Sequence, residues 1–347
     1  MNGSLHCPSG GDDQERVLLA HGEGGRLSRR LIRDRIAGRL ANPFLSSLAD
    51  AAILPPLAGR PVFTTDSFVV TPLFFPGGDI GTLAVYGTVN DLAVSGARPM
   101  WLSLSLILEE GLPLATLDRV LSSIAAASQR CGVAIVTGDT KVVPRGTADQ
   151  LFINTTGVGE LLEPAPAGPQ TLEPGDVLLA SGPIGRHGVA VLAAREALGF
   201  DPPPVSDCAP LWDAVHALRT GGIRCRALRD ATRGGVAAVL HEWATANPVT
   251  LEIDESRLPI TDDVRGVCEL LGLDPLLVAC EGTMVAAVPA DYAEAALSAL
   301  RQVPESAAAA IIGRVTAPRS TRVVVRRLLG RLQPLDEPAG APLPRIC

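Results

Sequence analysis

Lysine and aromatic residues are scarce in this chain. Among the 30 lysine and arginine residues only Lys141 is a lysine, and Phe, Trp and Tyr together make up 3% of the sequence. The nucleotide-binding P-loop ends in Gly-Lys-Ser/Thr, and no such motif occurs here. The formal net charge of −7 argues against the basic surface that nucleic-acid binding requires. Any nucleotide binding must therefore use a fold other than that of the P-loop proteins.

Paired cysteines and long apolar runs are also missing. The seven cysteines include no CxxC pair and no cluster at zinc-ligand spacing, which argues against a disulfide framework and a structural zinc site. No apolar stretch approaches the roughly 18 residues that a membrane-spanning helix needs. The first residues lack the basic flank and apolar core of a secretory signal. We therefore expect a cytoplasmic protein with reduced thiols.

The residues that are present predict a folded protein of two domains. The chain has 347 residues, 47% of them hydrophobic and 19% charged. Residues 160–175 are dense in proline and glycine without periodicity, which is typical of a linker. We expect a glycine-rich segment with a helix over 1–45, domains over 46–160 and 161–330, and an extended, flexible tail over 331–347 that ends in Cys347.

The periodicity of apolar residues predicts alternating strands and helices. In the first half we expect strands over 17–20, 62–70, 100–108, 133–136 and 151–158, and helices over 27–40, 79–95 and 114–124. In the second half we expect strands over 177–180, 227–228, 250–253, 283–288 and 309–313, and helices over 236–246, 262–271 and 291–303. This alternation predicts an α/β protein with an α+β sandwich in each half.

Four aspartates stand where strands are expected to end or turns to form: Asp66, Asp91, Asp139 and Asp230. Carboxylates from several turns are the ligands that magnesium prefers when it also neutralises a bound polyphosphate. Each of them could equally cap a helix or a turn. Glycines at 22–25, 77–78, 138, 182–185 and 234–235 could present backbone N–H groups to phosphates at helix starts.

Three further residues are candidates for chemistry. Lys141 is the one basic position that is not arginine. The ammonium group of lysine, unlike the guanidinium group of arginine, can lose a proton. Glu281 precedes an expected strand and could serve as the partner of Lys141 or as a base. Cys347 is the last residue, so it is not a prenylation site, which needs the cysteine fourth from the end. A thiol at the tip of a proline-rich arm is placed to be modified and carried between sites. The alternatives are a chance surface lysine, a solvated turn residue and an incidental terminal cysteine.

Several segments together resemble a known family. They are LLAHGEGGRLSRRLI, TTDSFVVTPLFFPGGDIGTLAVYGTVNDLAVSGARP, VTGDTKVV, RDATRGGVA and the terminal PRIC. They are similar to the hydrogenase maturation factors of the HypE (carbamoyl dehydratase) family, within the superfamily of aminoimidazole ribonucleotide synthetase and selenide water dikinase. The resemblance implies the two-domain aminoimidazole ribonucleotide synthetase-like fold, with 46–160 binding ATP and pairing with a second copy so that strands of both subunits form a barrel.

The resemblance also implies an activity and its residues. The activity is ATP-dependent dehydration of an S-carbamoyl group on Cys347 to a thiocyanate, the precursor of the cyanide ligands of nickel–iron hydrogenase. Lys141 and Glu281 would assist proton removal. The four aspartates would bind Mg²⁺, and ATP would be bound by Asp66, Asn90, Asp91, Gly138, Asp139, Thr140, Asp230, Thr232 and Arg233. The implied partners are a second copy of the chain, the carbamoyltransferase HypF and the HypC–HypD complex.

The sequence departs from the family pattern in three places. HGEGG stands where four glycines are usual, ATRGG where PTRGG is usual, and CEGTM where a stretch of the NEGK type is usual. Two other functions stay open at this point: ATP-dependent phosphorylation of a small molecule such as selenide or a purine precursor, and a non-catalytic scaffold that presents the tail.

Overall fold

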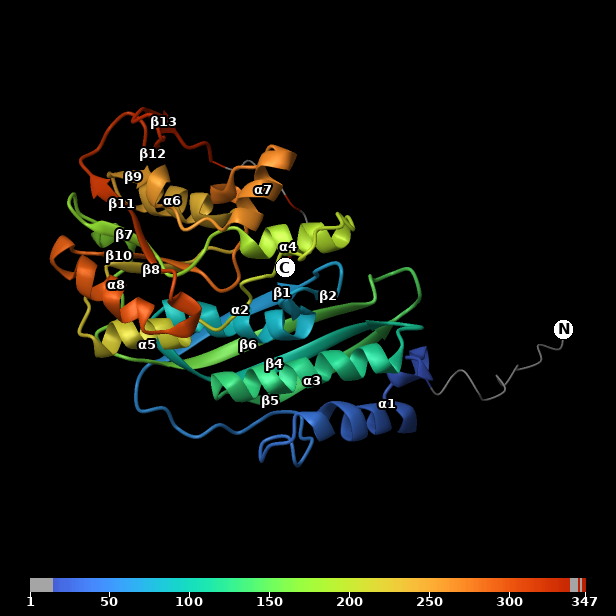
Figure 1. The fold of residues 1–347 in the computed structure, drawn as a ribbon. Helices are drawn as coiled ribbons and strands as arrows, with labels where there is room; N and C mark the ends of the chain where they lie inside the picture. Colours follow the sequence, from blue (N-terminus) through green and yellow to red (C-terminus); the bar gives the residue numbers. More distant parts are fainter. Residues whose placement is uncertain (1–14, 338–342, 344) are drawn as a thin grey trace.

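The computed structural model describes residues 15–337, 343 and 345–347, and it contains two sheets that lie in different halves of the chain (Figure 1). The first sheet has four strands, in the order β1-β6-β4-β5. Their bounds are β1 Pro61–Phe68, β6 Leu151–Leu161, β4 Ala97–Glu109 and β5 Ala134–Val143. Only the β4–β5 pair is parallel. Helices α2 (Ile80–Val94) and α3 (Leu114–Cys131) cover one face of this sheet (Figure 1).

Helix α2 lies at the centre of the molecule. All of its residues except Thr82 and Asp91 are buried, because the helix contacts β1, β6 and β4 on one side and α5 and β8 of the second half on another. A helix that is apolar all round is typical of such an enclosed position. A short hairpin, β2 (Phe74–Phe75) and β3 (Gly78–Asp79), leads into it.

The second sheet has seven strands in the order β13-β12-β9-β11-β7-β10-β8, and only the β12–β9 pair is parallel. Their bounds are β7 Val177–Ala180, β8 Ala227–Asp230, β9 Thr250–Asp254, β10 Met284–Val288, β11 Ala310–Thr316, β12 Val323–Arg326 and β13 Leu332–Pro334. Helix α6 (Gly235–Ala246) packs on one face, and α5 (Trp212–Thr220) and α8 (Ala293–Arg301) pack on the other. Helices α4 (Arg186–Arg195) and α7 (Asp262–Leu271) pack against each other beside the chain end (Figure 1).

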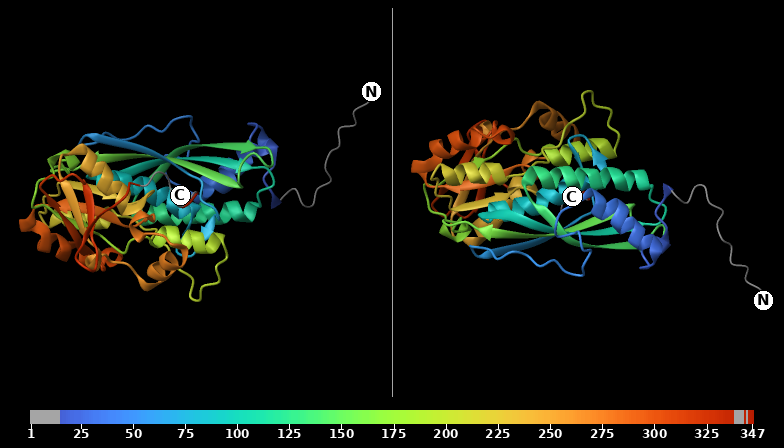
Figure 2. Two further views of the ribbon diagram at one scale, coloured as in Figure 1. Left: turned by 90° about the horizontal axis from the view of Figure 1, so that it is seen from above. Right: turned by 90° about the horizontal axis from the view of Figure 1, so that it is seen from below.

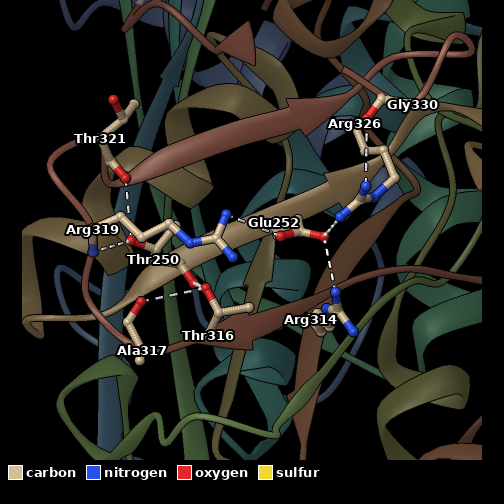
Figure 3. Close-up of polar contacts among 9 residues, drawn as sticks. All are labelled: Thr250, Glu252, Arg314, Thr316, Ala317, Arg319, Thr321, Arg326 and Gly330. Atoms are coloured by element: carbon tan, nitrogen blue, oxygen red, sulfur yellow. Dashed lines mark hydrogen bonds and ion pairs between the residues drawn. The ribbon is translucent and has the colours of Figure 1, made fainter. Parts of the chain in front are cut away.

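Three arginines surround a buried glutamate on the face of this sheet opposite α6. Glu252 of β9 is buried, and its carboxylate pairs with Arg326 at 2.6 Å, Arg314 at 3.1 Å and Arg319 at 3.4 Å (Figure 3). Leu251 and Ile253 point the other way, into the core under α6. The buried carboxylate is thus neutralised by guanidinium groups whose outer parts remain in water.

The remaining helical segments are short. They are η2 Leu19–His21, α1 Arg26–Arg30, the π-helical η3 Leu31–Ala37, η4 Pro169–Thr171, η5 Glu255–Arg257, η6 Pro275–Leu277, η7 Ala290–Tyr292 and η8 Pro304–Ser306. Among the described residues, no helix combines the length and apolarity needed to cross a membrane.

The sequence predicted most elements of both sheets, and two predictions were wrong. Residues 17–20 form no strand, because Leu19–His21 turn into a 3-10 helix. The strand expected to end at Gly138 continues to Val143 as β5, since β4 offers paired backbone groups along its whole length. Near the end of the chain, 332–334 of the predicted tail form the edge strand β13 beside β12.

The chain end returns to the middle of the molecule. The C-terminus lies between the two halves in all three views (Figures 1 and 2). Leu343 and Ile346 are buried, and the backbone N–H groups of Val69 and Thr71 donate to the carbonyls of Cys347 and Arg345. The last residues therefore run beside the segment that follows β1, in the manner of an added strand.

Candidate active site

Cys347 is partly buried between the two halves of the chain. Burial raises the pKa of its thiol to about 12, and the negative charges of Glu281 and Asp66 add to the effect, while Arg233 opposes it. Burial destabilises the thiolate, and neighbouring carboxylates repel it. In this position the sulfur is therefore a neutral thiol close to two acidic side chains.

Glu281 is the buried acid of this site. Its side chain is 3% exposed, and its Oε1 atom has no hydrogen-bond partner among the described residues. Burial raises its pKa well above the usual range, helped by the charges of Asp230 and Asp207. A carboxyl group with a raised pKa and a free oxygen is suited to moving protons.

The loop around Glu281 is fixed by a carboxylate that the sequence analysis missed. Asp207 accepts the backbone N–H of Glu281 and of Gly282, both at 3.1 Å. Gly282 is required here, since a Cβ at this position would lie 1.9 Å from the carbonyl oxygen of Asp207. The only signal in the sequence was an aspartate between prolines in PVSDCAP, which resembles many ordinary turns.

Asn90 joins the two halves of the chain next to this loop. Its side-chain amide donates to the carbonyls of Ala209 and Glu281, and its oxygen accepts the N–H of Leu211 at 2.7 Å. These three bonds use both amide hydrogens and one of the two lone pairs of the amide oxygen. In this structure Asn90 therefore holds the backbone at Glu281.

Three of the four predicted aspartates face one another across the domain boundary. Burial, and after it the negative charge of Asp91, raises the pKa of Asp66 to about 6. Burial raises the pKa of Asp230 to about 7, again with the charge of Asp91 next. Thr64 donates to Asp91 at 2.8 Å, and Thr88 donates to Asp66 at 3.3 Å. Arg229, whose Nε atom is 3.8 Å from Asp230, and Arg233 only partly offset this negative charge.

Strand ends account for only one of these aspartates. Asp66 lies within β1, Asp91 within α2 and Asp139 within β5, whereas Asp230 does end β8. The prediction that all four stand at strand ends or turns was therefore right for Asp230 and wrong for the other three, because helix α2 and long strands cross the molecule at these points. Proximity of three aspartates arises from packing between elements, which the local sequence pattern does not encode.

The carboxylates fit magnesium only in part. Among the described residues, no group of three or more His, Cys, Asp or Glu side chains is arranged to hold a metal ion alone. Magnesium in phosphoryl-transfer sites is bound through one or two carboxylates, with phosphate oxygens and water completing its shell. Repulsion among Asp66, Asp91 and Asp230 would be relieved by such a cation. The donor chemistry therefore suits a magnesium ion that arrives with a phosphate group.

The start of α6 is a feature of this site that is suited to phosphate. Arg233 is exposed. Its positive charge is close enough to Cys347, Glu281 and Asp66 to offset part of the rise in the pKa of each. Thr232 precedes it, and no side chain caps the first turn of α6. At the start of α2, which follows Gly77-Gly78, the side chain of Asp79 already accepts the N–H groups of the second and third helical residues.

The second group of predicted residues lies elsewhere. Gly138, Asp139, Thr140 and Lys141 are on β5, which is separated from β1 by β6 and β4, a distance of about 14 Å at ~4.8 Å per strand. Asp139 and Lys141 are in register with Ser105 and Ile107 of β4, which face away from α2. Asp66 is on the helix-covered face. Within one protomer the structure does not bring this group to Cys347.

Lys141 and Asp139 pair with each other at 3.2 Å, and both side chains are exposed. Gly138 makes no turn. A Cβ at this position would lie 2.1 Å from the carbonyl oxygen of Leu104, so glycine is needed for the close approach of β4. Residues 137–140 line a cavity of about 440 Å³ together with residues from 32–50.

Comparisons with known proteins agree with this architecture. Residues 48–161 match the model of the AIR synthase related protein N-terminal domain, and residues 173–326 match that of its C-terminal domain. The chain is 50% identical over 338 residues to the carbamoyl dehydratase HypE of Escherichia coli strain K12, covering 95% of this chain and 99% of that protein. The chain belongs to the carbamoyl dehydratase HypE family. As a member of this family it is an enzyme of hydrogenase maturation.

Solved structures of HypE proteins have the same fold. The crystal structure of E. coli HypE matches with a TM-score of 0.88, covering 92% of this chain and all of that one. A HypE in complex with ATP is 46% identical and matches with a TM-score of 0.89, covering 95% of this chain and 99% of that one. The HypE of a HypE–HypF complex is 44% identical, with a TM-score of 0.77 over 89% of this chain and 99% of that one.

Proposed function

We propose that this HypE family member uses ATP to dehydrate a carbamoyl group carried on its own Cys347 to a thiocyanate. The observation that carries the proposal is the position of Cys347, whose chain end lies between the two halves of the chain beside Glu281, Asp66 and Arg233, in the region called the cleft below. The chain thus supplies both the substrate-bearing sulfur and the groups around it. The thiocyanate carbon and nitrogen would then become a cyanide ligand of nickel–iron hydrogenase.

The reaction needs ATP because a carboxamide oxygen is a poor leaving group. The carbamoyl oxygen attacks the terminal phosphorus of ATP, ADP leaves, and one N–H proton is lost, which gives an imino phosphate on the sulfur. Loss of the second N–H proton and of phosphate then forms the carbon–nitrogen triple bond. The balance is S-carbamoyl plus ATP giving thiocyanate, ADP and inorganic phosphate. A base near the nitrogen and a dry site are both required.

Glu281 is our candidate for the base. Its free Oε1 atom can accept an N–H proton, and its raised pKa matches the task of taking a proton and later releasing it. Asn90 and Asp207 hold its backbone, so the carboxyl group is oriented before the substrate arrives. The buried surroundings exclude water that would otherwise hydrolyse the activated group.

Loading of Cys347 requires another position of the tail. A thiolate is the nucleophile in carbamoyl transfer, and inside the cleft burial holds the pKa of this thiol at about 12. In water the pKa of a cysteine is near 8.5, so the thiolate is far more populated outside. We therefore place carbamoylation, by a HypF protein, outside the cleft and dehydration inside it.

ATP and magnesium have a plausible set of ligands on this chain. Asp66, Asp91 and Asp230 would hold Mg²⁺ through one or two carboxylates, and Thr232, Arg233 and the start of α6 would contact phosphate. When bound, magnesium neutralises charge on the phosphates and the carboxylates. The second HypE structure compared above contains ATP, which supports this part of the proposal.

A homodimer is proposed for the open face of the four-stranded sheet. Phe63 and Ile107 are 70% and 40% exposed on this face, where Asp139 and Lys141 also lie. Large apolar side chains on an uncovered sheet face favour association with a second copy. In such a dimer the β5 residues, including Gly138 and Thr140, would act toward the nucleotide or the site of the other subunit. HypF and the HypC–HypD complex are the proposed partners that load and unload the tail.

The test follows the chain end by mass. The protein is carbamoylated with HypF and carbamoyl phosphate, freed of nucleotide, and then given magnesium with ATP or with a non-hydrolysable ATP analogue. Cleavage before Asp336 releases residues 336–347 for mass spectrometry. We expect this peptide to become one water lighter only with ATP. A carbamoyl group that stays intact would overturn the proposal, and a phosphorylated free small molecule would favour the kinase alternative.

A further inference from the structure

His187 is a buried histidine next to the tail, and the proposed reaction does not use it. It stands in the first turn of α4 and is 0% exposed. Its Nε2 atom lies 2.6 Å from the carbonyl oxygen of Ile346, and its Nδ1 atom lies 2.9 Å from Oγ of Ser206. The rings of His187 and Phe75 pack edge to face, with their centroids 5.3 Å apart.

The partners of His187 determine where its proton is. A carbonyl oxygen can only accept, so Nε2 must carry the hydrogen that is donated to Ile346. Burial lowers the pKa of His187, which favours the neutral ring, and in the neutral ring Nδ1 then accepts. Oγ of Ser206 accepts the backbone N–H of Cys208 at 3.0 Å, which leaves its own hydrogen for Nδ1. The hydrogen bonds thus run in one direction: Cys208 N–H donates to Ser206, Ser206 donates to His187, and His187 donates to the carbonyl of Ile346 in the tail.

This series of hydrogen bonds ends at the peptide unit directly before Cys347. Val69 and Thr71 hold the tail from the first half of the molecule, and His187 holds it from the second half. Leu343 packs near Gly188 in the same turn of α4, since a Cβ on Gly188 would be 3.2 Å from a Leu343 methyl group. A tail held from both sides keeps the sulfur in one place relative to Glu281.

We propose that His187, oriented by Ser206, is a positioning residue that latches the chain end in the cleft for dehydration. The proposal rests on the proposed function, in that the latched sulfur carries the carbamoyl group. His187 touches neither the sulfur nor a reacting atom, so its effect is on how much of the time, and in which orientation, Cys347 is inside. Loading occurs with the tail outside and does not need the latch.

The test compares His187→Phe, which keeps a ring but removes the donor, with His187→Gln, whose amide can still donate. Ser206→Ala removes the orienting hydroxyl and, with it, the acceptor of the Cys208 N–H. His241→Phe is the matched control, because His241 also bonds a tail carbonyl, that of Leu335 at 3.0 Å, but far upstream of Cys347. Two rates are measured: alkylation of Cys347 by a maleimide without nucleotide, and single-turnover dehydration of the preloaded protein.

We expect His187→Phe to speed alkylation and slow dehydration by about three- to tenfold each, as for loss of one hydrogen bond. Carbamoylation by HypF should be unchanged or faster, and His187→Gln should recover part of both rates. Alkylation and dehydration within twofold of wild type in a folded variant would overturn the latch. So would equal changes in His241→Phe.

Two further results remain decisive. Should His187→Phe not fold, Ser206→Ala carries the test, with smaller changes in the same directions expected and unchanged rates counting against the latch. Should the wild-type protein dehydrate nothing, the proposed function fails, and the alkylation rates alone then decide about the latch. Faster labelling of Cys347 in the variants would support it, and equal labelling would overturn it.

Discussion

At the scale of single residues, the cleft collects acids that are costly to ionise. Glu281, Asp66 and Asp230 all have raised pKa values, with burial as the first cause. Such a cluster is retained in a protein when it acts on a ligand, because it reduces the stability of the empty protein. The sequence identified all three residues, and it could not identify Asp207 or His187, since their importance depends on which backbone groups they meet.

The role of Glu281 predicts a clean separation of steps. Glu281→Gln keeps the size and shape of the side chain but removes its ability to take up a proton, so folding, carbamoylation of Cys347 and ATP binding should stay near wild type. Dehydration of the preloaded protein should fall by at least about a hundredfold, because the base is gone. Mass spectrometry of residues 336–347 in a single turnover measures the step. A rate near that of wild type would assign the base to another group.

Asp230 predicts a pH-dependent stability. Its folded pKa of about 7 lies above the unfolded value of 3.8, so its favourable contribution is present below pH 3.8 and is lost as the pH rises through 7. Asp230→Asn should therefore stabilise the ligand-free protein by about 1–3 kcal/mol at pH 8 and by little at pH 4. Urea unfolding across this range checks it. A gain that does not grow with pH would contradict the assignment.

At the scale of elements, pairing and packing override local signals. Gly138 and the three polar residues after it are typical of a turn, yet β4 runs alongside and turns them into strand β5. Conversely, strand β4 was predictable because its burial alternates with the period of a strand, and α2 was predictable from the length of its apolar run, although it is buried all round. The pattern of apolar residues does not predict which face of β5 carries Lys141.

The strand position of Gly138 leads to a stability test. Gly138→Ala should destabilise the protein by about 1–3 kcal/mol, because its Cβ would collide with the backbone of Leu104. Gly266→Ala is the control, since Gly266 is within α7 with open space around it, and alanine should stabilise that helix by about 0.5–1 kcal/mol. Urea denaturation of both variants is the measurement. Equal effects would show that Gly138 is not constrained by β4.

At the scale of the whole molecule, the site lies where the two halves meet. Their meeting depends on α2, on Asn90 and on the returning tail, none of which is visible in the composition of either half. The resemblance of five segments to the HypE family predicted the fold, whereas the residues alone predicted only an α/β protein with acids and a terminal thiol. The separation of Lys141 from Cys347 came only from the structure.

That separation predicts that Lys141 acts across a dimer. Lys141→Ala and Cys347→Ala should each be inactive alone, and mixing the two under conditions that exchange subunits should restore about a quarter of wild-type dehydration. The reason is that one cleft of each mixed dimer would hold an intact Cys347 beside an intact Lys141 of the other subunit. Dehydration per total protein after mixing is the readout. Activity of Lys141→Ala alone would leave the lysine without a role in the step.

The docking of the chain end in its own cleft has a kinetic consequence. Because the carbamoyl group is tethered to its catalyst, the group is present at an effective concentration in the millimolar range, set by the length of the tail. Turnover per dimer should therefore be indifferent to dilution for as long as the two subunits stay together, and a free peptide bearing the same modified cysteine would compete poorly. Each protein processes a single group until a partner removes it, so supply is governed by unloading.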